Sequence, residues 1–193
     1  MKKYTEFIKE NKGDGILMVV DVQTEFGDFI PKGFVDQLIE YCKNYHTVYQ
    51  IWDSNEGQKK PSYTFPNEKL AVVKKFGTKF SDELEETVKK LNEKYPDAKE
   101  GDIFEFDDVN SYVVRVKNNH AWFYVPEKMA QLFSSLKGKS VVVVGGAFGE
   151  CLSDVFVAME SFGIKVKYDK RYIYSAKTND DQNFIAQKQP NII

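Results

Sequence analysis

The sequence has no basic excess and no long apolar stretch. Its 193 residues include 27 lysines and arginines against 29 aspartates and glutamates, which gives a formal net charge of −2. Because nucleic acids are bound through basic surfaces that neutralise phosphates, we expect no nucleic-acid partner. The longest apolar runs, Ile16 to Val20 and Val141 to Val144, fall far short of the roughly 20 residues that span a bilayer, so we expect no membrane partner either.

Cysteine is also scarce, with Cys42 and Cys151 alone. The first residues, Met-Lys-Lys-Tyr-Thr-Glu, lack the apolar core and cleavage site of a secretory signal, and a cytoplasmic location is therefore expected. In that reducing compartment, two cysteines in very different sequence contexts are expected to remain free thiols.

The composition that is present belongs to a globular protein. Hydrophobic residues make up 42% and charged residues 29% of the chain, and aromatic residues are frequent. This length can bury one sizeable core and is short for two. We therefore expect a single domain over residues 1–193.

Apolar runs and helical spacings alternate along the chain. Strands are predicted at Gly15 to Asp21, Thr47 to Trp52, Ile103 to Phe106, Ser111 to Lys117, Ser140 to Val144 and Ile164 to Tyr168. Helices are predicted at Phe34 to Tyr45, from a cap at Ser81 to a stop at Tyr95-Pro96, at Pro126 to Leu136 and at about Glu150 to Phe162. The polar segment from Asn55 to Lys79 is predicted to be a long loop. The alternation predicts an α/β, three-layer Rossmann-like fold with a mainly parallel central sheet covered by helices on both faces.

Reactive residues stand at the predicted strand ends. Asp21, Asp53, Lys117 and the Gly145 to Cys151 turn each follow or end a strand. In open α/β sheets, ligands bind beyond the carboxyl ends of the strands. We therefore expect these residues to share one edge of the sheet and to form a site for a small-molecule substrate.

Cys151 stands where a glycine-rich turn meets a helix. The unpaired N–H groups and the dipole of a helix N-terminus favour a thiolate, which would make Cys151 a nucleophile. The alternative is a small buried cysteine that packs the first helical turn. Cys42 lies on an apolar helix face and is expected to belong to the core.

Asp21 and Lys117 also have two interpretations each. Asp21 either caps the turn that follows its strand or exchanges a proton with the thiol as a general base and acid. Lys117 either is a solvated strand end or lies beside the acid and the thiol, where its charge favours the ionised form of both.

Three segments in the same order resemble isochorismatase-like cysteine hydrolases. Residues 21–26 (Asp-Val-Gln-Thr-Glu-Phe) resemble the opening Asp-x-Gln-x-x-Phe motif of that family. Lys117 and the Ala-Trp-Phe of residues 121–123 are similar to its catalytic lysine and the small-aromatic segment that follows. Gly145 to Cys151 matches the spacing from the glycine at the strand end to the nucleophile. The agreement extends over roughly residues 14–175.

The resemblance implies a catalytic triad of Cys151 as nucleophile, Asp21 as base and acid, and Lys117 as electrostatic support. It also implies a cis peptide between Gly146 and Ala147, with an oxyanion hole formed by the N–H groups of Ala147 and Cys151. A substrate pocket is implied at Phe26, Phe65, Trp122 and Phe148. Around the cysteine, Phe148 and Leu152-Ser153 differ from the more usual residues of the family, so the pocket wall should differ as well. Relatives commonly form dimers or tetramers, so a homo-oligomer is expected.

Within the family, nicotinamidases bind a metal through an Asp-x-His motif and a further histidine. Here the corresponding residues are Asp53, Asn55 and Glu68, which offer only oxygen ligands. They are either plain loop residues or ligands of a weakly held divalent metal, and the ligand type then favours a hard cation over zinc.

The resemblance therefore implies hydrolysis of a small amide, nicotinamide or a similar compound, through a thioester intermediate. Two alternatives remain open. One is a metal-free isochorismatase-like hydrolase that acts on another small metabolite, and the other is a non-catalytic binding protein of the same fold.

Overall fold

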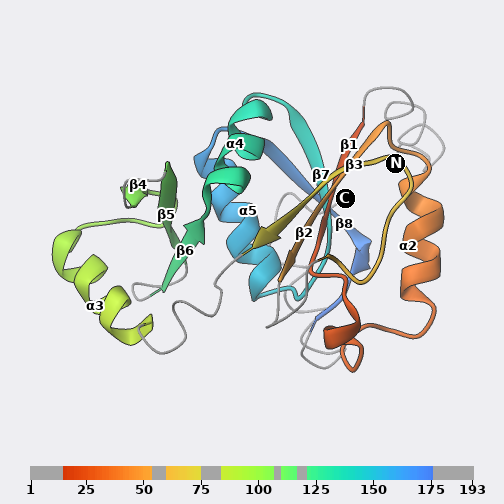
Figure 1. Ribbon diagram of the computed structural model, residues 1–193, viewed down its shortest axis with the longest axis horizontal. Coiled ribbons are helices and arrows are strands. Elements are labelled where there is room, and N and C mark those ends of the chain that lie inside the picture. The colour runs from red at the N-terminus through yellow and green to blue at the C-terminus, as the bar shows by residue number, and fades with distance from the viewer. Residues whose placement is uncertain (1–14, 54–59, 75–83, 107–109, 117–120, 176–193) are drawn as a thin grey trace, which may run out of the picture.

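The computed structural model describes residues 15–53, 60–74, 84–106, 110–116 and 121–175, which form two sheets and several helices (Figure 1). The strands are β1 (Ile16–Val20), β2 (Thr47–Asp53), β3 (Glu68–Lys74), β4 (Ile103–Phe106), β5 (Ser111–Val116), β6 (Ala121–Val125), β7 (Ser140–Gly145) and β8 (Lys165–Ile173). The helices are the short 3₁₀ helix η1 (Thr24–Phe26) and the α-helices α2 (Phe34–Cys42), α3 (Leu84–Lys94), α4 (Glu127–Ser135) and α5 (Cys151–Ser161).

The central sheet has the strand order β3-β2-β1-β7-β8, and every neighbouring pair is parallel. Its middle strand β1 is buried on both faces, because Leu17 and Val19 belong to one apolar cluster and Met18 and Val20 to another. A continuous apolar run is what a strand covered on both sides requires. The α/β fold class predicted from the sequence is confirmed.

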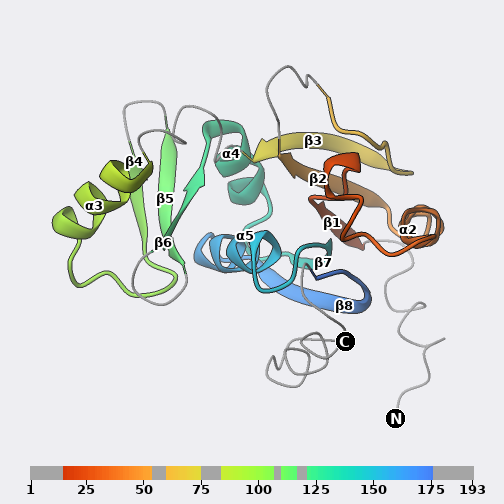
Figure 2. The ribbon, with the colours of Figure 1, turned by 90° about the horizontal axis from the view of Figure 1, so that it is seen from below.

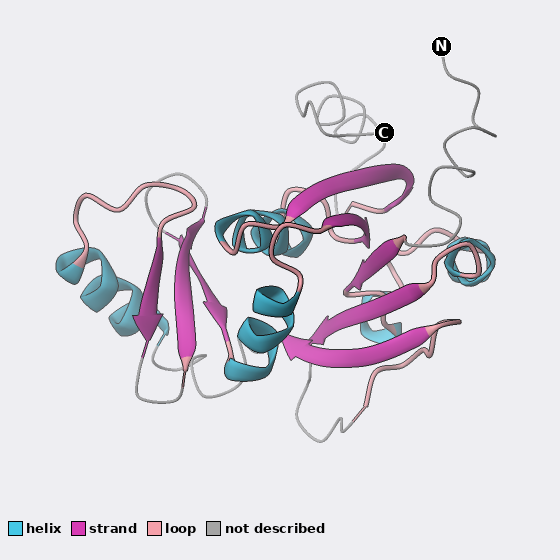
Figure 3. Cartoon of the chain, turned by 90° about the horizontal axis from the view of Figure 1, so that it is seen from above, coloured by secondary structure: helices cyan, strands magenta, loops and turns pink. Residues whose placement is uncertain are grey.

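Helices cover both faces of this sheet, as the views in Figures 2 and 3 show. Helix α2 lies on one face and buries Phe34, Leu38, Tyr41 and Cys42, which recur at helical spacing. Helices α4 and α5 lie on the other face, and α5 buries residues such as Leu152 and Val155 against the core. The predicted helices correspond to α2, α3, α4 and α5, although Ser81 lies outside the described residues.

A second sheet, in the order β4-β5-β6, is antiparallel and lies beyond α4 and α5 (Figure 2). One side of it, with Val114, Val116 and Phe123, belongs to the same apolar cluster as the helices. The other side, with Val113 and Trp122, packs against Leu91 of α3. Within the described residues, no helix is long and apolar enough to cross a membrane.

Strands β3, β5 and β6 differ from the prediction. Strand β3 lies within the segment that was predicted as a loop from Asn55 to Lys79. It is an edge strand whose first two residues and last residue are charged, and its Leu70 is 44% exposed, so only its four middle residues are apolar. Strand β6 was not predicted. Strand β5 was predicted, but it belongs to the small sheet and not to the central one.

Candidate active site

Asp21 lies directly after β1 at the carboxyl end of the central sheet. It is 1% exposed and adopts a positive φ of 51°, a conformation that costs a non-glycine residue roughly 1 to 2 kcal/mol. Its N–H donates to the carbonyl of Ile51 on β2 at 2.9 Å. Its carbonyl accepts a hydrogen bond from the Tyr174 hydroxyl at 2.5 Å. Backbone hydrogen bonds on both sides of Asp21 therefore hold this unfavourable conformation.

The turn from Gly145 to Cys151 lies beside Asp21, because β7 is the neighbour of β1. Gly145 pairs with Val20, and the N–H of Gly146 donates to the Val20 carbonyl at 3.0 Å. Gly145 has a φ of 105°, and a Cβ there would lie 2.0 Å from the Val20 carbonyl oxygen, so only glycine fits. The peptide between Gly146 and Ala147 is cis, as the resemblance implied.

Cys151 is the first residue of α5 and is partly exposed. It therefore lies in the first turn of an 11-residue helix, where the helix dipole favours an anion. Cys42, in contrast, is the last residue of α2 and is fully buried. Burial, and to a smaller extent the charge of Glu68, raises the pKa of Cys42 to about 12. The expectation that Cys42 belongs to the core is confirmed.

Tyr174 links Asp21 to the turn that precedes Cys151, and the sequence analysis missed it. It is 1% exposed, its hydroxyl donates to Asp21, and a Cβ on Gly146 would meet its ring at 2.5 Å. Burial raises the pKa of Tyr174 well above its ordinary value, and negative charge on Asp21 and on Cys151 raises it further. Both groups are therefore within electrostatic reach of one phenol. The available signal was the length of β8, which was predicted to end at Tyr168 but continues to Ile173.

The side-chain amide of Gln23, in the Asp-x-Gln segment, connects β1 to β2. Its side chain is fully buried, and its Nε2 donates to the carbonyl of Asp53 at 2.8 Å while its Oε1 accepts from the Asp53 N–H at 2.6 Å. This pair of hydrogen bonds joins the ends of β1 and β2. Asp53 is accordingly at the same edge of the sheet as Asp21, as predicted.

Lys117 and Asn55 lie outside the described residues. The argument that placed Lys117 at the shared edge needs correction, because β5, which ends at Val116, is not a strand of the central sheet. A shared parallel sheet therefore gives no reason for Lys117 to lie beside Asp21. Its role stays a prediction from the resemblance.

The three proposed metal ligands do not come together. Glu68 pairs with Val48 at the start of β2, whereas Asp53 is five residues further along that strand, roughly 17 Å away at the rise of a strand. Burial raises the pKa of Glu68, and its Oε2 accepts from the N–H of Phe65 at 3.3 Å. Glu68 and Phe65 thus lie at the amino end of the sheet. Within the described residues, no group of three or more His, Cys, Asp or Glu side chains is placed to hold a metal ion.

Two of the four predicted pocket residues, Phe65 and Trp122, lie away from the edge of the sheet that carries Asp21. Phe65 is 3% exposed and packs under α2 at the amino end of the sheet. Trp122 is 3% exposed and packs against α3, on the side of the small sheet that faces away from α5. Phe26 ends η1 close to Asp21 and is partly exposed. Phe148 belongs to the turn before Cys151, but its ring is buried at 5.8 Å from the ring of Tyr168.

The chain is similar to two solved structures at low identity. One is described as the structure of MAR1 ribonuclease from Caenorhabditis elegans, with 13% identity, a TM-score of 0.45, and coverage of 92% of this chain and 72% of that one. The other is described as a putative MAR1 ribonuclease from Leishmania major, with 16% identity, a TM-score of 0.43, and coverage of 94% and 77%. No protein-family model and no curated protein matches the sequence significantly. At such identities and scores these similarities carry no argument about activity, which rests on the site itself.

Proposed function

We propose that the chain is a cysteine-dependent hydrolase of a small amide, with Cys151 as nucleophile and Asp21 as general base and acid. The observation that carries the proposal is that Asp21 and the turn before Cys151 follow paired strands and are both hydrogen-bonded to the buried Tyr174. Asp21 follows β1, and Cys151 follows the turn after the adjacent parallel strand β7. An acid and a partly exposed thiol at one edge of a parallel sheet suit nucleophilic catalysis.

In the proposed reaction, Asp21 takes the thiol proton and the Cys151 sulfur attacks the amide carbon. The N–H groups of Ala147 and Cys151 would stabilise the oxyanion of the tetrahedral intermediate. Collapse of that intermediate breaks the carbon–nitrogen bond, and ammonia leaves with the proton from Asp21. Water then attacks the thioester, Asp21 accepts a proton from it, and the carboxylic acid and the free thiol are released. Lys117 is proposed to support the charges of the acid and the thiolate.

Nicotinamide is one candidate substrate, but the described residues do not fit the metal that would hold its pyridine nitrogen. Glu68 lies at the opposite end of the sheet from Asp53, so the proposed oxygen ligands do not form one site. We therefore route no step through a metal. This placement favours the second candidate, a metal-free isochorismatase-like hydrolase that acts on another small metabolite.

The direct test is a screen of small amides, nicotinamide included, with ammonia release as the readout. Cys151→Ala should abolish release while the far-UV circular dichroism spectrum stays unchanged. The matched variant Cys42→Ala removes the other thiol and should retain most of the activity. An essential Cys42 with a dispensable Cys151 would show that the site is assigned to the wrong cysteine.

A non-catalytic binding protein of the same fold is the remaining alternative. Such a protein has no need of a reactive thiol at the edge of the sheet. If no amide is hydrolysed and Cys151 alkylates with the pH dependence of a free thiol, near pKa 8.5, the cysteine chemistry proposed here is wrong.

A further inference from the structure

We propose that Tyr174 is a positioning residue for Asp21 and for the turn that leads to Cys151. The proposal rests on the function proposed above and adds a residue to it. Tyr174 itself would not exchange a proton with the substrate. Its part would be to hold the acid and the nucleophile in one geometry.

The first argument is the conformation of Asp21. A left-handed residue that is not glycine persists only where its surroundings hold it. Here the peptide carbonyl of Asp21 is held by the Tyr174 hydroxyl at 2.5 Å, and its N–H is held by the Ile51 carbonyl at 2.9 Å. Without the hydroxyl, the carbonyl would lose a buried hydrogen bond at a residue with a left-handed backbone. The direction of the carboxylate depends on that backbone.

The second argument is the contact with the nucleophile turn. The N–H of Tyr174 donates to the Gly145 carbonyl at 3.0 Å, and its carbonyl accepts from the N–H of Phe148 at 2.9 Å. Its ring lies so close to Gly146 that a Cβ there would be 2.5 Å from the ring. Tyr174 thus touches both the acid and three residues of the turn.

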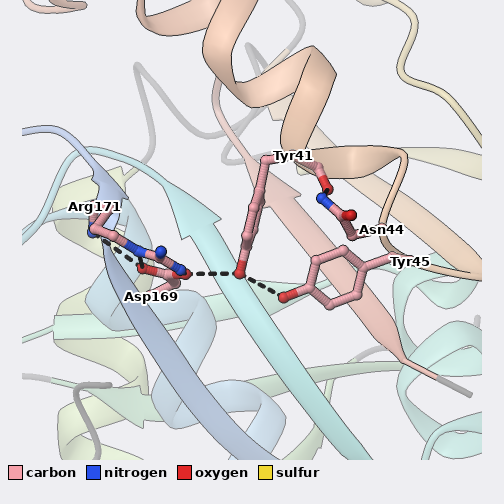
Figure 4. Close-up of polar contacts among 5 residues, drawn as sticks. All are labelled: Tyr41, Asn44, Tyr45, Asp169 and Arg171. Atoms are coloured by element: carbon pink, nitrogen blue, oxygen red, sulfur yellow. Dashed lines mark hydrogen bonds and ion pairs between the residues drawn. The ribbon is translucent and has the colours of Figure 1, made fainter. Parts of the chain in front are cut away.

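The third argument is that Tyr174 is itself held in place. Strand β8 contains an irregularity between Tyr168, which pairs with Val143, and Ile173, which pairs with Gly145. Figure 4 shows the buried carboxylate of Asp169 in this stretch, in contact with Arg171 and with the hydroxyl of Tyr41 on α2. The Tyr41 hydroxyl lies 2.7 Å from the Asp169 carboxylate.

This network anchors the end of β8 to α2. The Tyr41 ring stacks on Tyr172 at 4.0 Å, and Phe34 of α2 meets the Tyr174 ring edge-on at 5.8 Å. Packing therefore fixes the ring of Tyr174, and its hydroxyl is available to orient Asp21. Tyr174→Phe keeps the ring and its packing and removes only the oxygen.

The test is the alkylation of Cys151 by iodoacetamide, followed by peptide mass spectrometry from about pH 5 to about pH 10. In Tyr174→Phe, we expect alkylation near neutral pH to fall about fivefold, because one buried hydrogen bond is worth about 1 kcal/mol and Asp21 would take the thiol proton less readily. The midpoint of the pH profile should rise accordingly. Cys42 in the same molecule reports any general loosening of the fold.

The matched control is Tyr112→Phe. Tyr112 is a half-buried residue of β5 whose ring meets Phe162 edge-on at 5.6 Å, so this variant also removes one tyrosine hydroxyl, on the small sheet and outside the Asp169 network. Its Cys151 profile should equal that of the wild type. A Tyr174→Phe profile that equals the wild type would overturn the positioning role, since a purely structural tyrosine leaves the thiol titration unchanged.

Backbone amide hydrogen exchange separates this inference from the proposed function. Tyr174→Phe should speed exchange at the N–H groups of Asp21 and Gly146 by roughly fivefold, and Tyr112→Phe should not. If the wild-type Cys151 titrates as an ordinary thiol, the cysteine chemistry fails, but faster exchange in Tyr174→Phe still supports the positioning role. Unchanged exchange at both amides overturns it whatever the chemistry.

Discussion

Asn92 on α3 accepts hydrogen bonds from two buried side chains of the small sheet. Its Oδ1 accepts from Nη1 of Arg115 at 2.8 Å and from Nε1 of Trp122 at 3.0 Å. The two donors are 6% and 3% exposed, and the guanidinium lies over the indole ring at 5.0 Å. Asn92→Ala removes one acceptor and leaves both buried donors without it.

The expected loss follows from the two donors. A hydrogen bond to a charged group contributes about 1.5 to 3 kcal/mol, and one between neutral groups contributes about 0.5 to 1.5 kcal/mol. Their sum predicts that Asn92→Ala lowers the free energy of unfolding by about 2 to 4.5 kcal/mol. Asn92→Asp keeps an oxygen at the same place and adds a negative charge beside Arg115, so it should cost less than about 1 kcal/mol.

Urea unfolding followed by tryptophan fluorescence measures both variants. In conditions where they are folded, their turnover per folded molecule should match that of the wild type, because Trp122 packs against α3 and does not line the site. A loss below about 0.5 kcal/mol in Asn92→Ala would refute the energetic reasoning. If Asn92→Ala lowered substrate affinity without lowering stability, the original prediction that Trp122 lines the substrate pocket would be supported instead.

Four further outcomes are expected. Asp21→Asn should lower turnover by roughly 100-fold or more, measured by ammonia release, as the loss of a general acid and base usually does. Lys117→Ala should raise the midpoint of the pH profile for Cys151 alkylation, and an unchanged profile would remove Lys117 from the mechanism. The pKa of Cys42 is raised to about 12 in the folded state, so the unfolded chain ionises this thiol first and the protein loses stability as the pH rises from about 9 toward 12. Cys42→Ala has no such thiol, and its free energy of unfolding should therefore fall less than that of the wild type over the same pH range. Activity should survive dialysis against a chelator, since Glu68 lies far from Asp53, and restoration of a lost activity by a divalent metal would contradict this.

Local patterns in the sequence predicted the middle of the central sheet and one half of the site. Strands β1 and β7 are buried on both faces, so nearly all of their residues are apolar, and such a continuous apolar run predicts a strand. The alternation of strands and helices along the chain then predicted a mainly parallel sheet, without the order of its strands. Asp21, Asp53 and the turn before Cys151 could be assigned to one edge because each directly follows a strand of that sheet.

The tertiary structure decided which strands pair and which distant side chains meet. The residues of β5 suit a strand in either sheet, and only its partners β4 and β6 place it in the small one. Phe65 and Glu68 follow β2 in the sequence, but β3 runs parallel to β2, so they return to the amino end of the sheet. Tyr174 follows an irregular strand end whose course depends on contacts of Asp169 with α2. Strand pairing and such contacts join residues far apart in the chain, so no local pattern carries them, and the residue that bridges Asp21 and the nucleophile turn became visible only in the folded protein.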